Sequence, residues 1–442
     1  MSPPPADAAP SVPLQSAADR LLAKLMHPEQ IEQWAALILR VISAGLGYGI
    51  LALAARVTES LHAFSDFALV MAATALFGAV ATMGQETLLL RRLPVIQADG
   101  LVGYRPAILR SARIVTVGLA VFALLAMVYG AASFDRPDLQ LIVLTGLLVV
   151  GSGSAELFFA IQRGGGHVLG PVFRREIVWK LVLFLAAAGL LLAGRRVGAA
   201  TLAGWYLVGI VAAVVLSLAA IARVWWRAPG GGAEGAGEQG GAVAFFLLNF
   251  IVQAGTQLDV LVLGLAANIP AAQLGAFYAA QRTIQILYIL PYGASMTAAP
   301  RLPLAWATRD RAEIARLSRQ VSRSVALVVA ALALAAFVFR DEIMAIFRPE
   351  FVPYAALLPI LALSPLLSAL GGLHGQVASM CGLEGTYARW RFAILIVFLA
   401  AKLLVAHEGS LILFACVSAT EALAITLAGV LLAWRRLGVR LL

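Results

Sequence analysis

Twelve long apolar segments limit what this chain of 442 residues can fold into. A helix needs about 20 apolar residues to cross the hydrocarbon core of a bilayer. With 61% hydrophobic residues, 13% charged residues and a mean hydropathy of +0.90, the composition excludes an ordinary soluble domain. We therefore expect an all-α integral membrane protein with twelve transmembrane helices. The segments are 34–56, 66–88, 108–131, 140–162, 171–193, 199–222, 242–265, 272–298, 324–340, 354–378, 391–406 and 410–434.

The distribution of lysine and arginine predicts how these helices are oriented. When residues near the end of a segment are counted with the adjoining gap, 23 of the 33 basic residues lie in the tails and the even-numbered gaps, six lie in the odd-numbered gaps, and four lie deeper inside segments. Because basic residues favour the cytoplasmic side, both termini are predicted to be cytoplasmic. The net charge of +10 then reflects topology and contact with membrane lipids, so no nucleic-acid partner is expected.

Composition also divides the chain into parts. Residues 228–241 are rich in glycine and are predicted to form a flexible cytoplasmic linker. It separates a six-helix lobe at 34–227 from a second one at 242–442. Residues 1–33 are expected to be a cytoplasmic tail that could include an amphipathic helix.

The two lobes resemble each other. The run from Ser65 to Pro94 is similar to the run from Gly275 to Pro303. Since each lobe has an even number of helices, the repeat is parallel. Transporters built in this way bind substrate between their halves and expose it alternately to the two sides. We expect two six-helix bundles around a central lumen.

Arg282 is the intramembrane charge that most directly suggests a function. It lies near the middle of the eighth segment, where an ionised side chain is costly unless it faces protein or a water-filled cavity. Polar and aromatic residues recur around it at helical spacing, which predicts a face lining a wet lumen. Packing between helices by hydrogen-bonded polar side chains is the alternative. The predicted lumen residues are Arg282, Gln281, Gln285, Tyr278, Tyr288 and Tyr292 in the eighth segment and Asn249, Gln253 and Gln257 in the seventh.

Three other basic residues lie inside segments. Lys180 follows Glu176 by four residues, the favourable order for an ion pair on a helix, but it could also contact substrate. Arg40 could extend toward the membrane surface or line the lumen. Lys402 is expected at the outer interface of the membrane.

Acidic residues and glycines supply the candidates for coupling and gating. Buried carboxylates could bind a proton or a sodium ion, or pair with a buried arginine, and no other cofactor is expected. Three alternate glycines in the first segment could form a bending point or allow close helix packing. The predicted coupling or gating residues are Asp66, Glu156, Asp259, Glu421, Gly45, Gly47 and Gly49.

Several runs of residues resemble the multidrug/oligosaccharidyl-lipid/polysaccharide (MOP) exporter superfamily. The sequence from Leu274 to Arg282, followed by Leu290-Pro291-Tyr292-Gly293 and Ala299-Pro300-Arg301-Leu302, is similar to the eighth helix of these proteins. The first half matches through Ser65-Asp66-Phe67 and Met83 to Arg91. The resemblance is closer to the polysaccharide branch than to the drug-exporting branch.

This resemblance implies a flippase of the bacterial inner membrane. Its substrate would be a polyprenyl-diphosphate-linked oligosaccharide for surface or exopolysaccharide assembly, and a polysaccharide polymerase or glycosyltransferase could be a partner. Arg282 and Asp66 match motif positions that matter in the related lipid II flippases. A cation-coupled multidrug exporter of the same fold is the alternative. A membrane polymerase or ligase is disfavoured because no outer gap is long enough to carry a catalytic loop.

Overall fold

The computed structural model describes residues 28–98, 100–134, 138–166, 169–228, 240–289, 291 and 301–439. The helices of its first half are α2 (Pro28–Val57), α3 (Leu61–Val80), α4 (Gln85–Ala98), α5 (Tyr104–Ser133), α6 (Leu139–Gly164), α7 (Leu169–Phe173), the π-helix η1 (Arg174–Val178), α8 (Trp179–Leu192) and α9 (Ala199–Trp225). The second half contains α10 (Gly240–Leu265), α11 (Ala271–Gln285), the 3-10 helix η2 (Ile286–Tyr288), α13 (Arg301–Ala307), α14 (Arg311–Val338), α15 (Arg340–Phe347), the 3-10 helix η3 (Pro349–Tyr354), α16 (Leu357–Leu370), α17 (His374–Met380), α18 (Glu384–Glu408), α19 (Leu411–Leu432) and the π-helix η4 (Ala433–Leu437).

The helices confirm a multi-pass membrane architecture but differ from the expected twelve uniform spans. Among the described residues, nine helices are long and apolar enough to cross a membrane, and α16 with α17, bent by 49°, makes a tenth candidate. The predicted segment 171–193 is divided by η1, and the described part of 272–298 changes to a 3-10 helix at η2. Both changes alter the hydrogen-bond register of a helix, which hydropathy does not report.

The second predicted segment, 66–88, is also not one helix. A turn at 81–84 separates α3 from α4. Met83 and Gly84 there have φ angles of 54° and 74°, a left-handed conformation that glycine adopts readily and methionine does not. Helix α5 packs tightly on this turn, since a Cβ atom on Gly118 would lie 2.2 Å from the carbonyl oxygen of Ala81.

Helix α2 continues without interruption through Gly45, Gly47 and Gly49. A Cβ atom on Gly49 would lie 2.9 Å from the ring of Phe184 on α8. Of the two interpretations of these glycines, close helix packing therefore accounts for Gly49 in this conformation.

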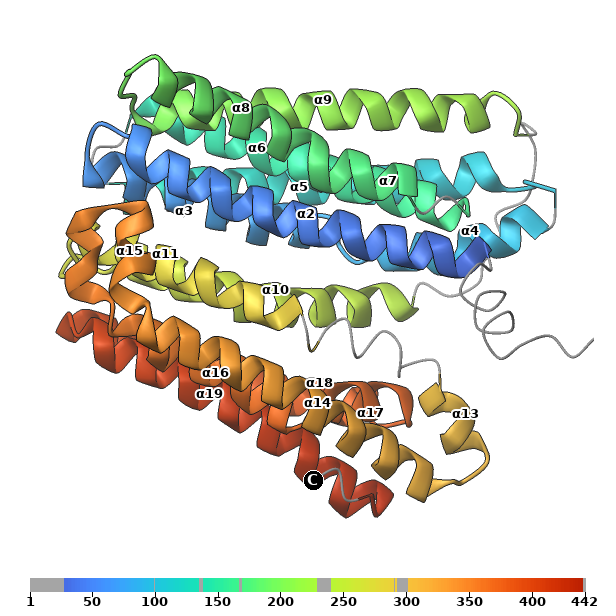
Figure 1. Ribbon diagram of the computed structural model, residues 1–442. Helices are drawn as coiled ribbons and strands as arrows, with labels where there is room; N and C mark the ends of the chain where they lie inside the picture. Colours follow the sequence, from blue (N-terminus) through green and yellow to red (C-terminus); the bar gives the residue numbers. More distant parts are fainter. Residues whose placement is uncertain are drawn as a thin grey trace, which may run out of the picture.

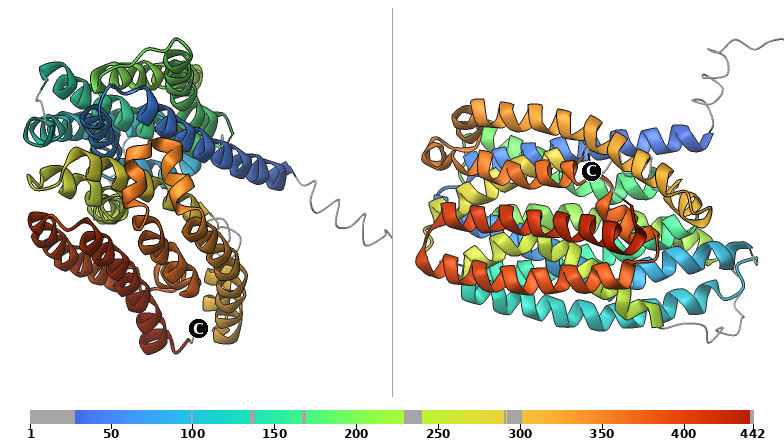
Figure 2. Two further views of the ribbon diagram at one scale, coloured as in Figure 1. Left: turned by 60° about the vertical axis from the view of Figure 1, so that its left-hand side comes forward. Right: turned by 90° about the horizontal axis from the view of Figure 1, so that it is seen from below.

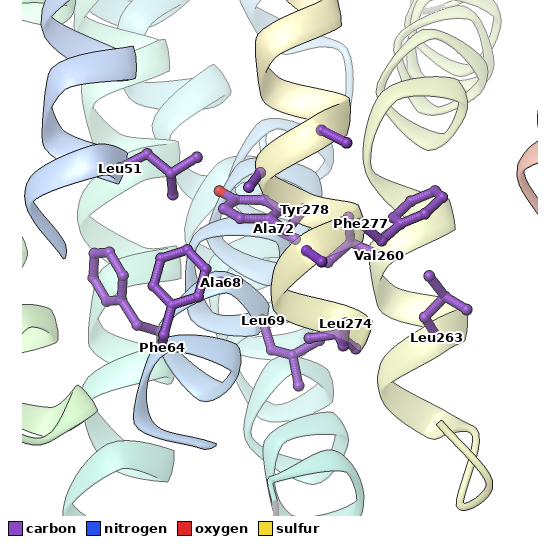
Figure 3. Close-up of a cluster of buried hydrophobic side chains, with 14 of the residues drawn as sticks. Leu51, Phe64, Ala68, Leu69, Ala72, Val260, Leu263, Leu274, Phe277 and Tyr278 are labelled. Atoms are coloured by element: carbon purple, nitrogen blue, oxygen red, sulfur yellow. The ribbon is translucent and has the colours of Figure 1, made fainter. Parts of the chain in front are cut away.

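The two halves share one hydrophobic core at one end of the molecule. We call the end at which α2 begins the basic end and the end at which α2 finishes the distal end (right and left in Figure 1). Toward the distal end, α10 and α11 of the second half pack against α3 of the first half. The left view of Figure 2 shows the yellow-green helices of the second half next to the blue helices of the first. Figure 3 shows Leu51 and Phe64 of the first half in one apolar cluster with Val260 and Phe277 of the second.

The basic end is organised differently, because each half has its own core there. One cluster includes Leu89, Ile108 and Leu157 and uses only residues of the first half. Another includes Leu302 and Leu373 and uses only residues of the second half. The halves thus share a core toward the distal end, whereas their cores are separate at the basic end.

Candidate functional site

Arg282 lies on α11 where the two halves meet. Its Nη1 atom donates a hydrogen bond to Gln285 Oε1 at 2.8 Å, and its Nη2 atom donates to Gln257 Oε1 at 2.8 Å. The guanidinium carbon is 4.8 Å from the centroid of the Tyr278 ring. These partners are neutral, and Nε is buried without a hydrogen-bond partner among the described residues. The positive charge of Arg282 is therefore held in place by neutral groups.

A chain of alternating charges lies in the first half. Glu156 on α6 accepts hydrogen bonds from Arg175 of η1, and Nη1 of Arg175 is 2.7 Å from Glu176 Oε1. Glu176 Oε2 lies 3.6 Å from Lys180 Nζ on α8, which confirms the predicted ion pair. The side chains in this chain are 14% to 29% exposed, so they are only partly buried.

Ser43 of α2 completes this chain. Its Oγ atom donates to Glu176 Oε2 at 3.0 Å and accepts from Lys180 Nζ, which also donates to the Ser43 carbonyl oxygen at 3.2 Å. Lys180 lies within electrostatic range of Arg282, and Arg40 lies within that of Glu176. The positive charges of Lys180 in the first half and Arg282 in the second half therefore lie in the same region, where the two halves meet.

A second charge cluster lies inside the second half. Lys402 of α18 donates to Asp259 of α10 and to Glu421 of α19. All three side chains are less than 10% exposed. Lys402, which we expect at the outer interface of the membrane, is thus buried between α10, α18 and α19, where two carboxylates compensate the cost of burying its ammonium group. The three charges sum to −1.

A cavity of about 620 Å³ lies beside this triad. Its described lining comes from α10, α11, α16, α17, α18 and α19 and from adjoining segments, all in the second half. Gln281, Gln285, Tyr288, Asp259 and Glu421 contribute to it. The polar stripe predicted for the eighth segment is thus divided, since Gln281, Gln285 and Tyr288 line this cavity and Arg282 contacts residues at the boundary between the halves.

Other predicted lumen residues occupy varied positions. Tyr278 is only 1% exposed and belongs to the shared apolar core. Asn249 donates to the carbonyl oxygen of Ala79 at 3.1 Å and to Glu86 Oε1 at 3.2 Å, so it stabilises the break between α3 and α4. Gln253 is partly buried one turn from the residues that contact Arg282. Tyr292 lies outside the described residues.

Asp66, the linker and the N-terminal tail lie away from these charge clusters or largely outside the described residues. Asp66 is buried on α3 near the distal end. Most of the linker at 228–241 and of the tail at 1–33 lies outside the described residues. Within the described part of the chain, no group of three or more His, Cys, Asp or Glu side chains is placed to hold a metal ion.

Sequence reasoning missed three residues that the structure places in these clusters. Arg175 is one of the 23 basic residues that predict the orientation of the helices, and the structure shows that it also bridges Glu156 and Glu176. Ser43 had no sequence signal, because its partners lie 133 and 137 residues away. Glu86 lies in the first turn of α4, and its Oε2 atom is buried without a partner among the described residues. The glycine at position 84, just before Glu86 in the sequence, could have indicated a turn at this point.

Solved transporters share this fold. No protein-family model and no curated protein sequence matches the chain. An inward-facing multidrug resistance MATE transporter of the MOP superfamily is similar with a TM-score of 0.66 and 13% identity, over 90% of this chain and 94% of that one. An outward-facing MATE transporter is similar with a TM-score of 0.62 and 13% identity, over 91% and 94% of the two chains.

A third similar structure is relevant because of its described pocket. It is a MOP superfamily transporter from Pyrococcus furiosus with a TM-score of 0.62 and 14% identity, over 91% of this chain and 95% of that one. Reverse polarity of its binding pocket is said to suggest a different function for it. The protein described here is therefore a multi-pass membrane protein with the MOP transporter fold seen in MATE proteins.

Proposed function

We propose that this protein is an exporter that binds the diphosphate of a lipid-linked oligosaccharide and moves it across the bacterial inner membrane by alternating access. The observation that carries the proposal is Arg282, whose charge is held by two glutamines rather than by a carboxylate. Guanidinium groups bind phosphate oxygens in pairs, and Lys180 adds a second positive charge nearby.

The conformation is consistent with loading from one side. The halves share a core at the distal end and have separate cores at the basic end. If the basic end is cytoplasmic, as the distribution of lysine and arginine predicts, the substrate enters from the cytoplasm. A polymerase or glycosyltransferase would then supply or consume the lipid-linked sugar.

A cation-coupled multidrug exporter is the second candidate. The cavity in the second half is lined by Asp259, Glu421 and Tyr288, which are groups that suit a cationic aromatic compound. Lys402 weakens this candidate because it already pairs with both carboxylates. The polarity of the pocket is thus the property that separates the two functions.

Ligand-dependent stability of the purified protein distinguishes them. We expect undecaprenyl diphosphate to raise the unfolding temperature, with undecaprenol and tetraphenylphosphonium having little effect. A ligand present at 100 times its Kd stabilises a protein by about 2.7 kcal/mol. Arg282→Ala should remove the stabilisation, and Arg282→Lys should restore part of it, because a point charge replaces a two-pronged donor.

Arg389→Ala is the matched control. Arg389 is an exposed arginine whose Nε donates to the Gly385 carbonyl oxygen of its own helix at 3.3 Å. This variant should respond to the diphosphate as the unmodified protein does. Stabilisation by tetraphenylphosphonium alone would favour the multidrug exporter. Equal stabilisation of Arg282→Ala by undecaprenyl diphosphate would show that the anion binds elsewhere.

A further inference from the structure

Two arginines at the distal end each cap a helix of the opposite half. Arg56, in the last turn of α2, donates from Nε to the carbonyl oxygen of Ile346 on α15 at 2.8 Å. Arg348, just after α15, donates to the carbonyl oxygens of Ala55 and Thr58, and to Thr58 Oγ1 at 3.0 Å. The last carbonyl groups of a helix lack partners within it and form the negative end of its dipole, so a guanidinium group satisfies both needs.

The acceptors for Arg348 are held in a fixed position. Thr58 forms a parallel bridge with Val197, which precedes α9. The backbone N–H of Val197 donates to the Val57 carbonyl oxygen at 2.9 Å, and the N–H of Glu59 donates to the Val197 carbonyl oxygen at 3.1 Å. The end of α2 is therefore tied to the rest of the first half. A displacement of Arg348 would therefore be transmitted through these bonds to the first half as a whole.

Aromatic contacts lie beside this exchange of caps. The rings of Tyr48 and Phe347 are 5.1 Å apart, and those of Phe64 and Phe351 are 5.6 Å apart, each pair joining one half to the other. Gly275 fits against the second pair, where a Cβ atom would lie 3.0 Å from Phe64 and 3.1 Å from Phe351. These contacts exclude water from the distal side of the shared core.

We propose that Arg56 and Arg348 form a reversible latch that holds the distal end closed, and that both swapped caps must break before substrate can leave on that side. Opening would expose the carbonyl groups at the ends of α2 and α15 to water at the same moment. Water can replace those hydrogen bonds, so each contributes only a modest net free energy. Together they favour the closed state and still allow the distal end to open.

The charge of Arg348 persists in this setting. Partial burial lowers the pKa of Arg348 from its usual value, and the charge of Glu350 opposes that shift. A guanidinium group remains protonated at neutral pH in proteins. The latch also gives a role to two of the six arginines that lie on the side of the chain where basic residues are scarce.

Distances between spin labels test the latch directly. Cysteines replace the exposed Glu59 in the first half and Glu342 in the second, in a chain in which Cys381 and Cys416 have been changed to alanine. Double electron–electron resonance on the purified protein then reports the separation of the halves at the distal end. We expect one short distance in the latched protein and a second, longer distance when the latch is removed.

The variants should differ in how far they raise the ratio of open to closed molecules. Arg56→Ala removes one hydrogen bond and should raise the ratio of open to closed molecules about tenfold, and Arg348→Ala, which removes three, should raise it further. Arg348→Lys should lie between Arg348→Ala and the unmodified protein, which a general folding defect would not produce.

Arg340→Ala serves as the control at the same end. Arg340 contacts Asp341 and Phe337, both in its own half, and its removal should leave the distances unchanged. The proposal is overturned if Arg348→Ala and the double variant with Arg56→Ala keep the single short distance. It is also overturned if Arg340→Ala opens the distal end as much as Arg348→Ala does. The test requires no substrate, so its result is independent of which compound is exported.

Discussion

The first half of the molecule holds its intramembrane charges in a partly exposed chain, whereas the second half holds them in a buried triad. The chain from Glu156 to Lys180 alternates in sign and sums to zero, and its side chains are 14% to 29% exposed. The triad of Asp259, Lys402 and Glu421 sums to −1, with side chains 5% to 9% exposed.

This difference in burial separates two physical roles. Partners in the chain can part at a lower cost, because an ion pair at a partly exposed site contributes less to stability than a buried one. A member of the triad cannot leave without placing an uncompensated charge in a medium of low dielectric constant. The chain is suited to rearrange when an anion arrives at Arg282. The triad is suited to fix the packing of α10, α18 and α19.

The largest effect should follow removal of the ammonium group from the triad. Lys402→Ala leaves Asp259 and Glu421 facing each other, and we expect the free energy of unfolding to fall by about 3 to 5 kcal/mol. Thermal unfolding in detergent measures this loss. Neutralising both acids in the same chain, with Asp259→Asn and Glu421→Gln, should restore most of it. A loss below about 1 kcal/mol, the usual value for a surface pair, would remove the distinction between triad and chain.

A second prediction concerns the excess negative charge of the triad. If one proton neutralises that charge during transport, Glu421→Gln should make transport insensitive to external pH while substrate still stabilises the protein. Glu156→Gln should have a weaker effect, since Arg175 already balances Glu156. Transport by proteoliposomes over a range of pH measures both. Unaltered pH dependence in each variant and in the double variant would leave the two acids as structural partners of Lys402 and Arg175.

A smaller loss is expected from the chain. Arg175→Ala breaks the pairs with Glu156 and Glu176, and the free energy of unfolding should fall by about 1 to 2 kcal/mol. Unfolding in 1 M salt should show a reduced difference, because ions screen exposed pairs. The effect of Lys402→Ala should not change with salt. A salt-independent loss for Arg175→Ala would mean that the pairs of the chain are as buried as those of the triad.

The smallest effect should come from the hydroxyl group that closes the chain. Ser43→Ala removes bonds to Glu176 and Lys180, and we expect a loss of about 0.5 to 1 kcal/mol in unfolding free energy. The cost is modest because Lys180 keeps its bond to the Ser43 carbonyl oxygen at 3.2 Å. Ser324→Ala is the matched control, since that hydroxyl bonds only within its own exposed helix face among the described residues. Equal losses in the two variants would show that Ser43 has no special role.

Local features of this molecule could be predicted from the sequence, because they depend on helix geometry alone. The ion pair between Glu176 and Lys180 follows from a spacing of four residues on a helix. The apolar segments follow from the length needed to cross a bilayer, and ten of them match described helices or the bent pair. The superfamily fold could be recognised from runs such as Leu274 to Arg282.

Contacts between distant helices could not be predicted, because they depend on how α10, α18 and α19 pack. Lys402 lies 143 residues from Asp259 in the sequence, and no spacing rule joins them. The same limit applies to Arg348 and Thr58, which are 290 residues apart. Hydropathy also does not report the π-helical turn at Arg174–Val178, since it changes hydrogen-bond register and not polarity.

The position of the shared core sets an order of events during biosynthesis. That core joins Ile50 near the start of the chain to Ala415 in the last long helix, so it is incomplete until almost the whole protein has been inserted. The cluster that includes Leu89 and Leu157 needs only the first half and can form while the second half is still on the ribosome. Until then, Phe64 and Phe67 would face lipid or an insertion factor, because the helices that cover them are translated some 200 residues later.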